Sequence, residues 1–166
     1  MITGIQAGAQ NAYDISTDEK TGQLIFRGPL SFDDLRQEPK FSWFDENLTG
    51  YTPEYHDMRY LADNLPQYSL VVFMGTWCDD SHYLIPKLYS LLNKMHFPVP
   101  RLTMYGVDRD KNALGAERER YNITKVPTII LFRDNKEVGR ITESVIKSLE
   151  SDLAGIIRQD IMDQNK

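Results

Sequence analysis

Short apolar runs alternate with amphipathic stretches in the second half of the chain. Residues 70–74 form a continuous apolar run with β-branched members, which is typical of a strand buried on both faces. Residues 102–107 and 128–132 are predicted to form two further strands. Residues 138–141 follow a polar turn and are expected to pair antiparallel with the strand before that turn.

Helical periodicity lies between the predicted strands and after them. Leucines recur every three or four positions over residues 81–94, which predicts an amphipathic helix. Residues 112–121 are predicted to form a short helix, and residues 143–163 a closing helix. The resulting order, β-α-β-α-β-β-α, predicts an α/β fold in which helices flank a central mixed β-sheet.

The chain before residue 66 has a less regular pattern. Residues 13–16 and 23–26 flank a polar turn and predict a β-hairpin. Ser31 is placed to cap a short helix. A further helix is expected to begin at Thr52-Pro53, with proline in its first turn, and to end at Pro66.

Aromatic side chains gather between residues 41 and 55 without clear periodicity. We expect this cluster to pack against an edge of the sheet rather than to bind a ligand. The sequence therefore predicts two parts: residues 1–65 form an N-terminal extension, a hairpin and short helices that pack on the core, and residues 66–166 form the main domain.

The charge balance narrows the class of partner. Lysine plus arginine number 19 and aspartate plus glutamate number 24 in 166 residues, which gives a net charge of −5. Nucleic acids and anionic membranes attract clustered positive charge, so neither is expected as a partner. No apolar run approaches the roughly 20 residues of a membrane span, and residues 1–4 lack the features of a signal peptide. A complete chain would be cytoplasmic, a chain that had lost a leader would be exported, and we expect a monomer.

Cys78 is the only cysteine of the chain, so an intramolecular disulfide and a zinc site built on several thiolates are both excluded. The three histidines, His56, His82 and His96, do not have the spacing of metal ligands. We therefore expect no metal and no other cofactor. His82 is expected to lie on the surface of the helix that follows Cys78.

Cys78 lies where a predicted buried strand leads into a predicted helix. The positive end of a helix stabilises an anion, and a thiol placed there is more readily ionised than a free thiol. A single cysteine is often just a small buried apolar residue. Its position at the start of the helix, after Trp77 and before two aspartates, favours a reactive thiol.

Several separate motifs resemble one known family. Residues 76–81, Thr-Trp-Cys-Asp-Asp-Ser, stand where thioredoxins have Trp-Cys-Gly-Pro-Cys, and Pro86 takes the place of their helix-kinking proline. Val107-Asp108 ends the middle strand in the same way, and residues 121–128 are similar to the segment that leads to the family's cis-proline. Over residues 66–165 the chain resembles the thioredoxin superfamily, which implies a thioredoxin-like fold.

The resemblance implies a role for each matching residue. Cys78 would be the attacking nucleophile, and Trp77 an exposed aromatic side chain beside the substrate groove. Pro127 would be a cis-proline next to the thiol, and Val126, with Thr128 after it, would leave its backbone able to pair with an extended substrate. Two plainer interpretations stay open: Trp77 could cap the core, and Pro127 could be a trans proline at a strand edge.

The departures from the family pattern limit the chemistry. Ser81 stands in place of the second cysteine, so the chain cannot resolve a mixed disulfide on Cys78 by itself. Val72 replaces the family's buried acid, and Met104 replaces its lysine partner. Because both charges are absent together, no unpaired charge is buried. The usual two-thiol reductase cycle is therefore not expected.

Asp79 and Asp80 could either cap the helix or tune the thiol. A carboxylate about 6 Å from the sulfur disfavours the thiolate by about 0.7–1.4 kcal/mol. The helix terminus returns about 0.3–2 kcal/mol, and a hydrogen bond from the Ser81 hydroxyl adds about 1 kcal/mol. Since these contributions nearly cancel, we expect only a modest stabilisation of the thiolate.

Two functions fit these features. The first is a monothiol redox protein, at most a thiol-disulfide oxidoreductase, in which Cys78 forms mixed disulfides with a protein or a low-molecular-weight thiol and an external thiol releases it. The Trp-Cys-x-Asp-Ser variant resembles one found in bacterial thioredoxin-like proteins. The alternative is a non-catalytic thioredoxin-fold module that binds an extended peptide. The motifs of monothiol glutaredoxins and of peroxiredoxins are absent.

Overall fold

A six-stranded mixed sheet forms the centre of the molecule, with strand order β1-β2-β4-β3-β5-β6. The computed structural model describes residues 12–166, and the expectation for residues 1–4 lies outside the described part. Strands β3 and β4 are parallel, and the other neighbouring strands are antiparallel. The strands are β1 (Asp14–Thr17), β2 (Leu24–Leu30), β3 (Ser69–Met74), β4 (Leu102–Gly106), β5 (Thr128–Arg133) and β6 (Lys136–Thr142).

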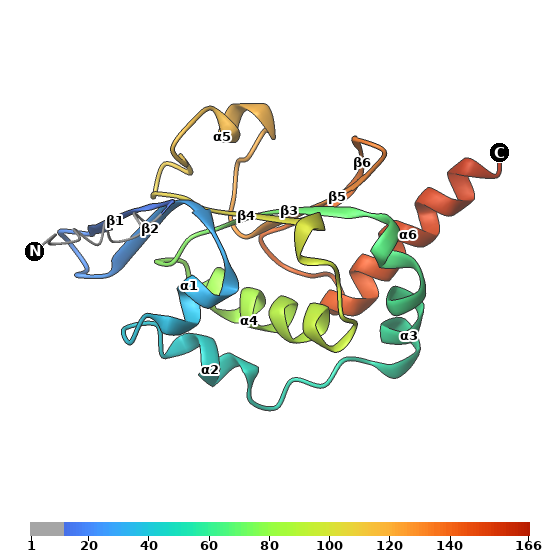
Figure 1. Cartoon of the computed structure of the whole chain (residues 1–166), viewed down its shortest axis with the longest axis horizontal. Helices are drawn as coiled ribbons and strands as arrows, with labels where there is room; N and C mark the ends of the chain where they lie inside the picture. Colours follow the sequence, from blue (N-terminus) through green and yellow to red (C-terminus); the bar gives the residue numbers. More distant parts are fainter. Residues whose placement is uncertain (1–11) are drawn as a thin grey trace, which may run out of the picture.

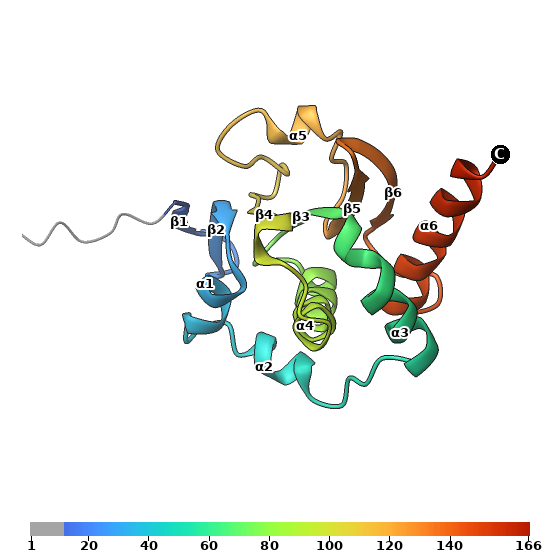
Figure 2. The ribbon, with the colours of Figure 1, turned by 45° about the vertical axis from the view of Figure 1, so that its right-hand side comes forward.

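Helices cover both faces of the sheet unequally (Figures 1 and 2). One face carries α4 with the helices around it, whereas the other carries α5 and its flanking loops (Figure 1). The helices are α1 (Phe32–Gln37), α2 (Trp43–Leu48), α3 (Tyr55–Asn64), α4 (Asp79–Lys94), α5 (Glu117–Arg120) and α6 (Leu149–Gln164), with short 3-10 turns at Leu65–Gln67 and Val99–Arg101. No helix in this part of the chain is long and apolar enough to cross a membrane.

The alternation of side chains along β3 explains the two apolar cores. Val72 and Met74 point into the larger core, under α4, and Phe73 points into a smaller core on the opposite face. All three side chains are fully buried. The predicted α/β fold with a helix-flanked mixed sheet is therefore confirmed.

The N-terminal hairpin extends this sheet. Strand β2 pairs antiparallel with β4, so that Gly28 lies opposite Gly106 and Leu30 opposite Met104. A Cβ atom at position 106 would overlap the carbonyl oxygen of Phe26, so glycine is needed there for β2 to approach β4. The predicted hairpin forms, and it contributes two strands to the sheet as well as packing on the core.

Two helices, α3 and α4, begin at residues other than those predicted from the sequence. Helix α3 begins at Tyr55 because the Glu54 carboxylate accepts hydrogen bonds from two N–H groups of the first turn, those of His56 and Asp57. Helix α4 begins two residues before the predicted start, with Cys78 at its N-cap. Ser31 caps α1 as predicted, in a capping box with Asp34.

Two predicted helices are shorter than expected. Helix α5 has only four residues, because the Asp108 carboxylate binds the N–H groups of Asp110 and Asn112 and holds the preceding segment in a turn. Helix α6 begins at Leu149 and not at residue 143, with Ser148 as its N-cap. Residues 143–148 form an irregular connection.

Helix α2 was not predicted, and it explains where the aromatic cluster packs. Phe44 is almost fully buried, and Phe41 makes an edge-on contact with Phe26 of β2 at 4.9 Å between ring centroids. Trp43 packs on the first turns of α4 through the ring of His82. The expected packing of this cluster against the sheet is found, and α4 forms the other half of the contact.

Candidate functional site

Cys78 lies at the junction of strand β3 and helix α4. The turn from Gly75 to Cys78 is closed by a 3.0 Å hydrogen bond from the Cys78 N–H to the Gly75 carbonyl. The Cys78 side chain is partly buried, and its Sγ atom lies 3.5 Å from the carbonyl oxygen of Val126. The structure thus places the thiol at the N-terminus of a 16-residue helix and beside the segment that precedes β5.

The segment beside the thiol has an unusual backbone. The Val126–Pro127 peptide bond is cis. Thr128 is buried, and its hydroxyl donates a 2.7 Å hydrogen bond to the carbonyl of Lys125, which closes the turn around this bond. The carbonyl of Pro127 accepts a 2.7 Å hydrogen bond from the Glu143 N–H. The loop after β6 therefore also supports this segment.

Ser81 holds the turn rather than the thiol. Its side chain is fully buried, and its Oγ atom accepts a 3.1 Å hydrogen bond from the Gly75 N–H. The expected hydrogen bond from this hydroxyl to Cys78 is not among the contacts within residues 12–166. The hydroxyl links the start of the turn to the first turn of α4.

Val72 and Met104 lie directly opposite each other in the parallel pairing of β3 and β4. Both side chains are buried in the larger core. The two positions that hold an acid and a lysine in the family pattern are therefore neighbours in this structure. Here both positions hold apolar side chains. Because both side chains are apolar, neither can exchange a proton with the thiol.

Asp79 and Asp80 occupy the first turn of α4 and face solvent. The Asp79 side chain is fully exposed, at 3.8 Å from the Nδ1 atom of His82. Negative charges in a first turn interact favourably with the helix dipole. Because solvent surrounds both carboxylates, their effect on the thiol is weakened by screening.

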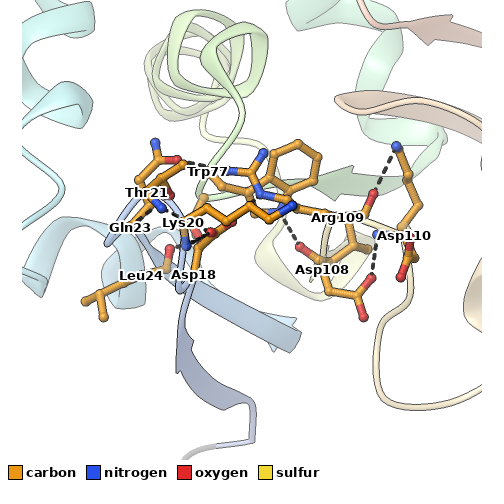
Figure 3. A network of polar contacts seen from close by, with 12 residues as sticks. Asp18, Lys20, Thr21, Gln23, Leu24, Trp77, Asp108, Arg109 and Asp110 are labelled. Carbon is orange, nitrogen blue, oxygen red and sulfur yellow. Dashed lines mark hydrogen bonds and ion pairs between the residues drawn. The ribbon is translucent and has the colours of Figure 1, made fainter.

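Trp77 is less accessible than the resemblance implied. Its Nε1–H donates a 2.8 Å hydrogen bond to the carbonyl of Val107, and its ring lies against Gly75. The Arg109 guanidinium lies 4.9 Å from the ring centroid (Figure 3). The Lys111 ammonium lies 5.9 Å from the same centroid. The side chain is partly buried under cationic groups and is not an open aromatic surface.

His82 was expected on the surface, and this expectation is wrong. Its side chain is only 15 % exposed. The ring stacks on Trp43 with centroids 4.3 Å apart, and its Nε2 atom lies 2.6 Å from the carbonyl oxygen of Thr76. Since a carbonyl oxygen only accepts hydrogen bonds, Nε2 carries the hydrogen. The unpredicted helix α2 covers this side of α4, which is why the sequence pattern gave no sign of the contact.

A hollow of about 270 Å³ lies between the start of α4 and the loop after β6. It is lined by Asp80, Tyr83, Leu84, Glu143, Ser144 and Val145. The Glu143 carboxylate also pairs with Lys125 at 3.0 Å, one residue before Val126. The hollow therefore lies beside the first turn of α4, and its lining residue Glu143 contacts Lys125 through its carboxylate and Pro127 through its N–H.

A family model described as Thioredoxin matches residues 57–155, which is more than half of the chain. The chain belongs to the thioredoxin family. Membership of the thioredoxin family supports a redox function at the level of the family. The family model does not reach the hairpin or helices α1 and α2.

Several thioredoxins are similar to part of this thioredoxin-family chain. The thioredoxin of Chlamydia trachomatis is 37 % identical over 71 residues, which is 43 % of this chain and 64 % of that protein. The TPR repeat-containing thioredoxin of Arabidopsis thaliana is 37 % identical over 86 residues, 51 % of this chain and 21 % of that protein. The matches thus cover less than two thirds of these relatives' own length.

A solved structure extends the likeness in fold. A Pseudomonas aeruginosa protein of unknown function is 14 % identical, with a TM-score of 0.52, over 79 % of this chain and 87 % of that chain. At this identity the likeness concerns the fold alone.

Proposed function

We propose that the protein is a monothiol thiol-disulfide exchange protein, with Cys78 as its nucleophile. The observation that carries this proposal is the placement of the chain's only cysteine at the N-terminus of α4, 3.5 Å from the Val126 carbonyl. A helix N-terminus favours the thiolate, which is the attacking form. Ser81 lies where a second thiol would be needed for resolution within the chain.

The exchange has two balanced steps. The Cys78 thiolate attacks a disulfide R–S–S–R′, the bond from Cys78 to the R sulfur forms, and R′ leaves as a thiolate that takes a proton from solvent. An external thiol then attacks the R sulfur of the mixed disulfide. That step releases Cys78 as a thiolate and carries R away in a new disulfide, so the external thiol is the reductant.

The other site residues would bind and orient the partner. In this proposal Pro127 and Thr128 hold the Val126 backbone beside the thiol, where an extended chain could pair with it. Trp77 forms the opposite wall, and Asp79 and Asp80 modulate the charge at the entrance. The partner is a protein or low-molecular-weight thiol or disulfide, and the protein acts as a monomer.

Incubation with glutathione disulfide tests this function directly. We expect a mass increase of one glutathionyl group, which is absent in Cys78→Ser and reversed by added thiol. We also expect negligible turnover in a dithiol-coupled insulin reduction assay, because no second cysteine can resolve the intermediate. Rapid turnover in that assay would show that the loss of the second cysteine does not limit the chemistry.

The hollow beside Glu143 favours a second candidate, a non-catalytic module that binds an extended peptide. In that case Cys78 would react with a disulfide reagent no faster than a small model thiol. Cys78→Ala would then leave the binding of a partner unchanged. A fast, Cys78-dependent reaction would reject this candidate.

A further inference from the structure

The turn of the N-terminal hairpin reaches the active-site tryptophan through one arginine (Figure 3). The Arg109 guanidinium donates to the Asp18 carboxylate and, at 3.1 Å, to the side-chain oxygen of Gln23. The same guanidinium covers the Trp77 ring. The Asp18 side chain is only 9 % exposed, and the hydrogen bond from Arg109 holds the pKa of that carboxyl below its usual range.

A second contact ties the hairpin to the residue before Trp77. The Thr76 hydroxyl is buried, donates a 2.7 Å hydrogen bond to the carbonyl of Leu24 and accepts a 3.2 Å hydrogen bond from the N–H of Phe26. The backbone of β2 therefore bonds to the Thr76 side chain through one carbonyl and one N–H group. The hairpin thus contacts both residues before Cys78. It bonds directly to the Thr76 hydroxyl, and it reaches Trp77 through Arg109.

These contacts fix the Trp77 side chain from three directions. Its Nε1–H is bound to Val107, its ring lies against Gly75, and the guanidinium of Arg109 covers it. An exposed ion pair alone contributes little. Here the same guanidinium also bonds to Gln23 and stacks on an indole, so several contacts must break before the ring can move.

We propose that Arg109 and Asp18 form a clasp that fixes Trp77 beside Cys78 and restricts which disulfides can reach the thiol. The inference rests on the proposed thiol exchange. With the Trp77 flank closed, partners approach across the opposite flank, along Val126 and the hollow beside Glu143. Disulfides that are small or carried on extended, flexible segments fit this approach. Disulfides on folded surfaces that must lie over Trp77 do not.

The clasp is tested by comparing two disulfides in a Trp43→Phe background, in which Trp77 is the only tryptophan. One probe is hydroxyethyl disulfide, and the other is a pyridyl disulfide attached to a small globular protein. We expect Arg109→Ala to leave the reaction of Cys78 with the small probe within about twofold and to raise its reaction with the bulky probe about fivefold, the size expected for loss of one cation–π contact. Acrylamide quenching of Trp77 fluorescence should rise in the same variant.

Arg158→Ala is the matched control. Arg158 also covers an aromatic ring, Tyr60 at 4.5 Å, and pairs with an aspartate, Asp57 at 2.9 Å, but it lies on α6. We expect this variant to keep the original ratio of the two rates. Asp18→Asn keeps the guanidinium over the ring and should give a smaller change in the same direction as Arg109→Ala, and it replaces that variant if Arg109→Ala does not fold.

Each outcome decides a separate question. Unchanged quenching and an unchanged ratio of rates in folded Arg109→Ala or Asp18→Asn would overturn the clasp. If Cys78 reacts with neither probe faster than a model thiol in any variant, the proposed exchange function fails, while the quenching data still decide whether Arg109 holds Trp77. A large change in Arg158→Ala would show that the effect is not local to the clasp.

Discussion

Ser81 makes a hydrogen bond that a cysteine at this position would not reproduce with the same strength. Its hydroxyl accepts the Gly75 N–H inside the turn that positions Cys78. Two residues three positions apart at the start of a helix have Cα atoms about 5–6 Å apart, within the range of a disulfide. A cysteine at position 81 could therefore form a disulfide with Cys78, whereas the serine present in this chain cannot.

We expect Ser81→Cys to form an intramolecular disulfide with Cys78 after mild oxidation. The loop it closes is very short, so the gain in stability should be small. The loss of the hydroxyl should cost about 1 kcal/mol of unfolding free energy. Free-thiol counts before and after oxidation measure the bond, and Ser81→Ala controls for the lost hydroxyl. Two free thiols in the folded, oxidised variant would contradict the proposed site geometry.

The apolar pair of Val72 and Met104 permits a second test. Val72→Asp alone should lower the unfolding free energy by about 3–5 kcal/mol, because it buries a carboxylate without a partner. Met104→Lys in the same chain should recover part of that loss, since the two side chains are opposite each other in adjacent strands. Urea unfolding of the two single variants and the double variant gives the coupling. Additive losses would mean that the side chains do not meet.

At the scale of elements, β2 and α2 surround the turn and helix that carry Cys78. The family model does not cover either element. Strand β2 bonds to the turn that leads to Cys78, and helix α2 supplies Trp43, the residue on which His82 stacks. Both elements precede the matched residues 57–155. The N-terminal segment is thus part of the environment of Cys78 and not only a covering of the core.

Helix α2 should contribute strongly to stability in spite of its six residues. Phe44 is 1 % exposed and contacts Tyr89 of α4 edge-on at 5.5 Å. We expect Phe44→Ala to lower the unfolding free energy by about 3–5 kcal/mol, through lost burial and a residual cavity. Trp43→Phe, which keeps an aromatic ring at the partly buried neighbouring position, should cost much less. Equal and small losses in denaturant unfolding would mean that α2 is only loosely attached.

The sequence predicted what depends on neighbouring residues and missed what depends on distant ones. Residues 70–74 of β3 and 129–132 of β5 are unbroken apolar runs, and α4 has several turns of leucine periodicity, so the local pattern was sufficient. Helix α2 is too short to display a period, and the start of α6 is set by Asp152, whose carboxylate binds the N–H groups of Ile146 and Lys147.

The candidate site likewise contains features that the sequence predicted and contacts that it did not. The position of Cys78 at the start of a helix followed from the order of strand and helix, and its nearness to Val126 followed from the resemblance to thioredoxins. The contact of Arg109 with Asp18 joins residues 91 positions apart, and the stacking of His82 on Trp43 needs a helix that the pattern does not reveal. Contacts between polar surface residues leave no periodic signal, so the partners of Trp77 and His82 could be found only from the structure.

At the scale of the whole molecule, buried carboxylates attach α6 to the rest of the chain. Glu150 is 4 % exposed and accepts hydrogen bonds from the Tyr51 hydroxyl and the Glu54 N–H, both at 2.9 Å. Asp160 is 7 % exposed and is bound by Arg133 at 2.7 and 3.0 Å. Such groups stabilise a fold only while their partners and their charge are kept.

Asp160 should make the fold sensitive to acid. The hydrogen bond from Arg133, together with that from Tyr68, holds the pKa of the Asp160 carboxyl below its usual range. The folded state therefore binds the proton less readily than the unfolded state. The contribution to stability is complete above the unfolded pKa of about 3.9 and is lost as the pH falls through the lower folded value.

Urea unfolding of the protein and of Asp160→Asn between about pH 6 and pH 2 measures this effect. We expect the variant to be less stable at pH 6, by about 1.5–3 kcal/mol for lost hydrogen bonds to a charged group. The difference should shrink as the solution becomes more acidic. Asp134→Asn, at an exposed ion pair with the same arginine, is the control and should change little. A constant difference at every pH would show that Asp160 does not titrate below its usual range.

The hydrogen bond from the Phe26 N–H to the Thr76 hydroxyl gives the protein a built-in reporter. Phe26 is 2 % exposed, so its amide proton can exchange with deuterated solvent only when β2 separates from the turn that leads to Cys78. The exchange rate of this one amide therefore measures how often the turn beside Cys78 opens. A reagent that reacts with Cys78 leaves Phe26 chemically unchanged. The opening of the turn can therefore be followed while the reaction proceeds.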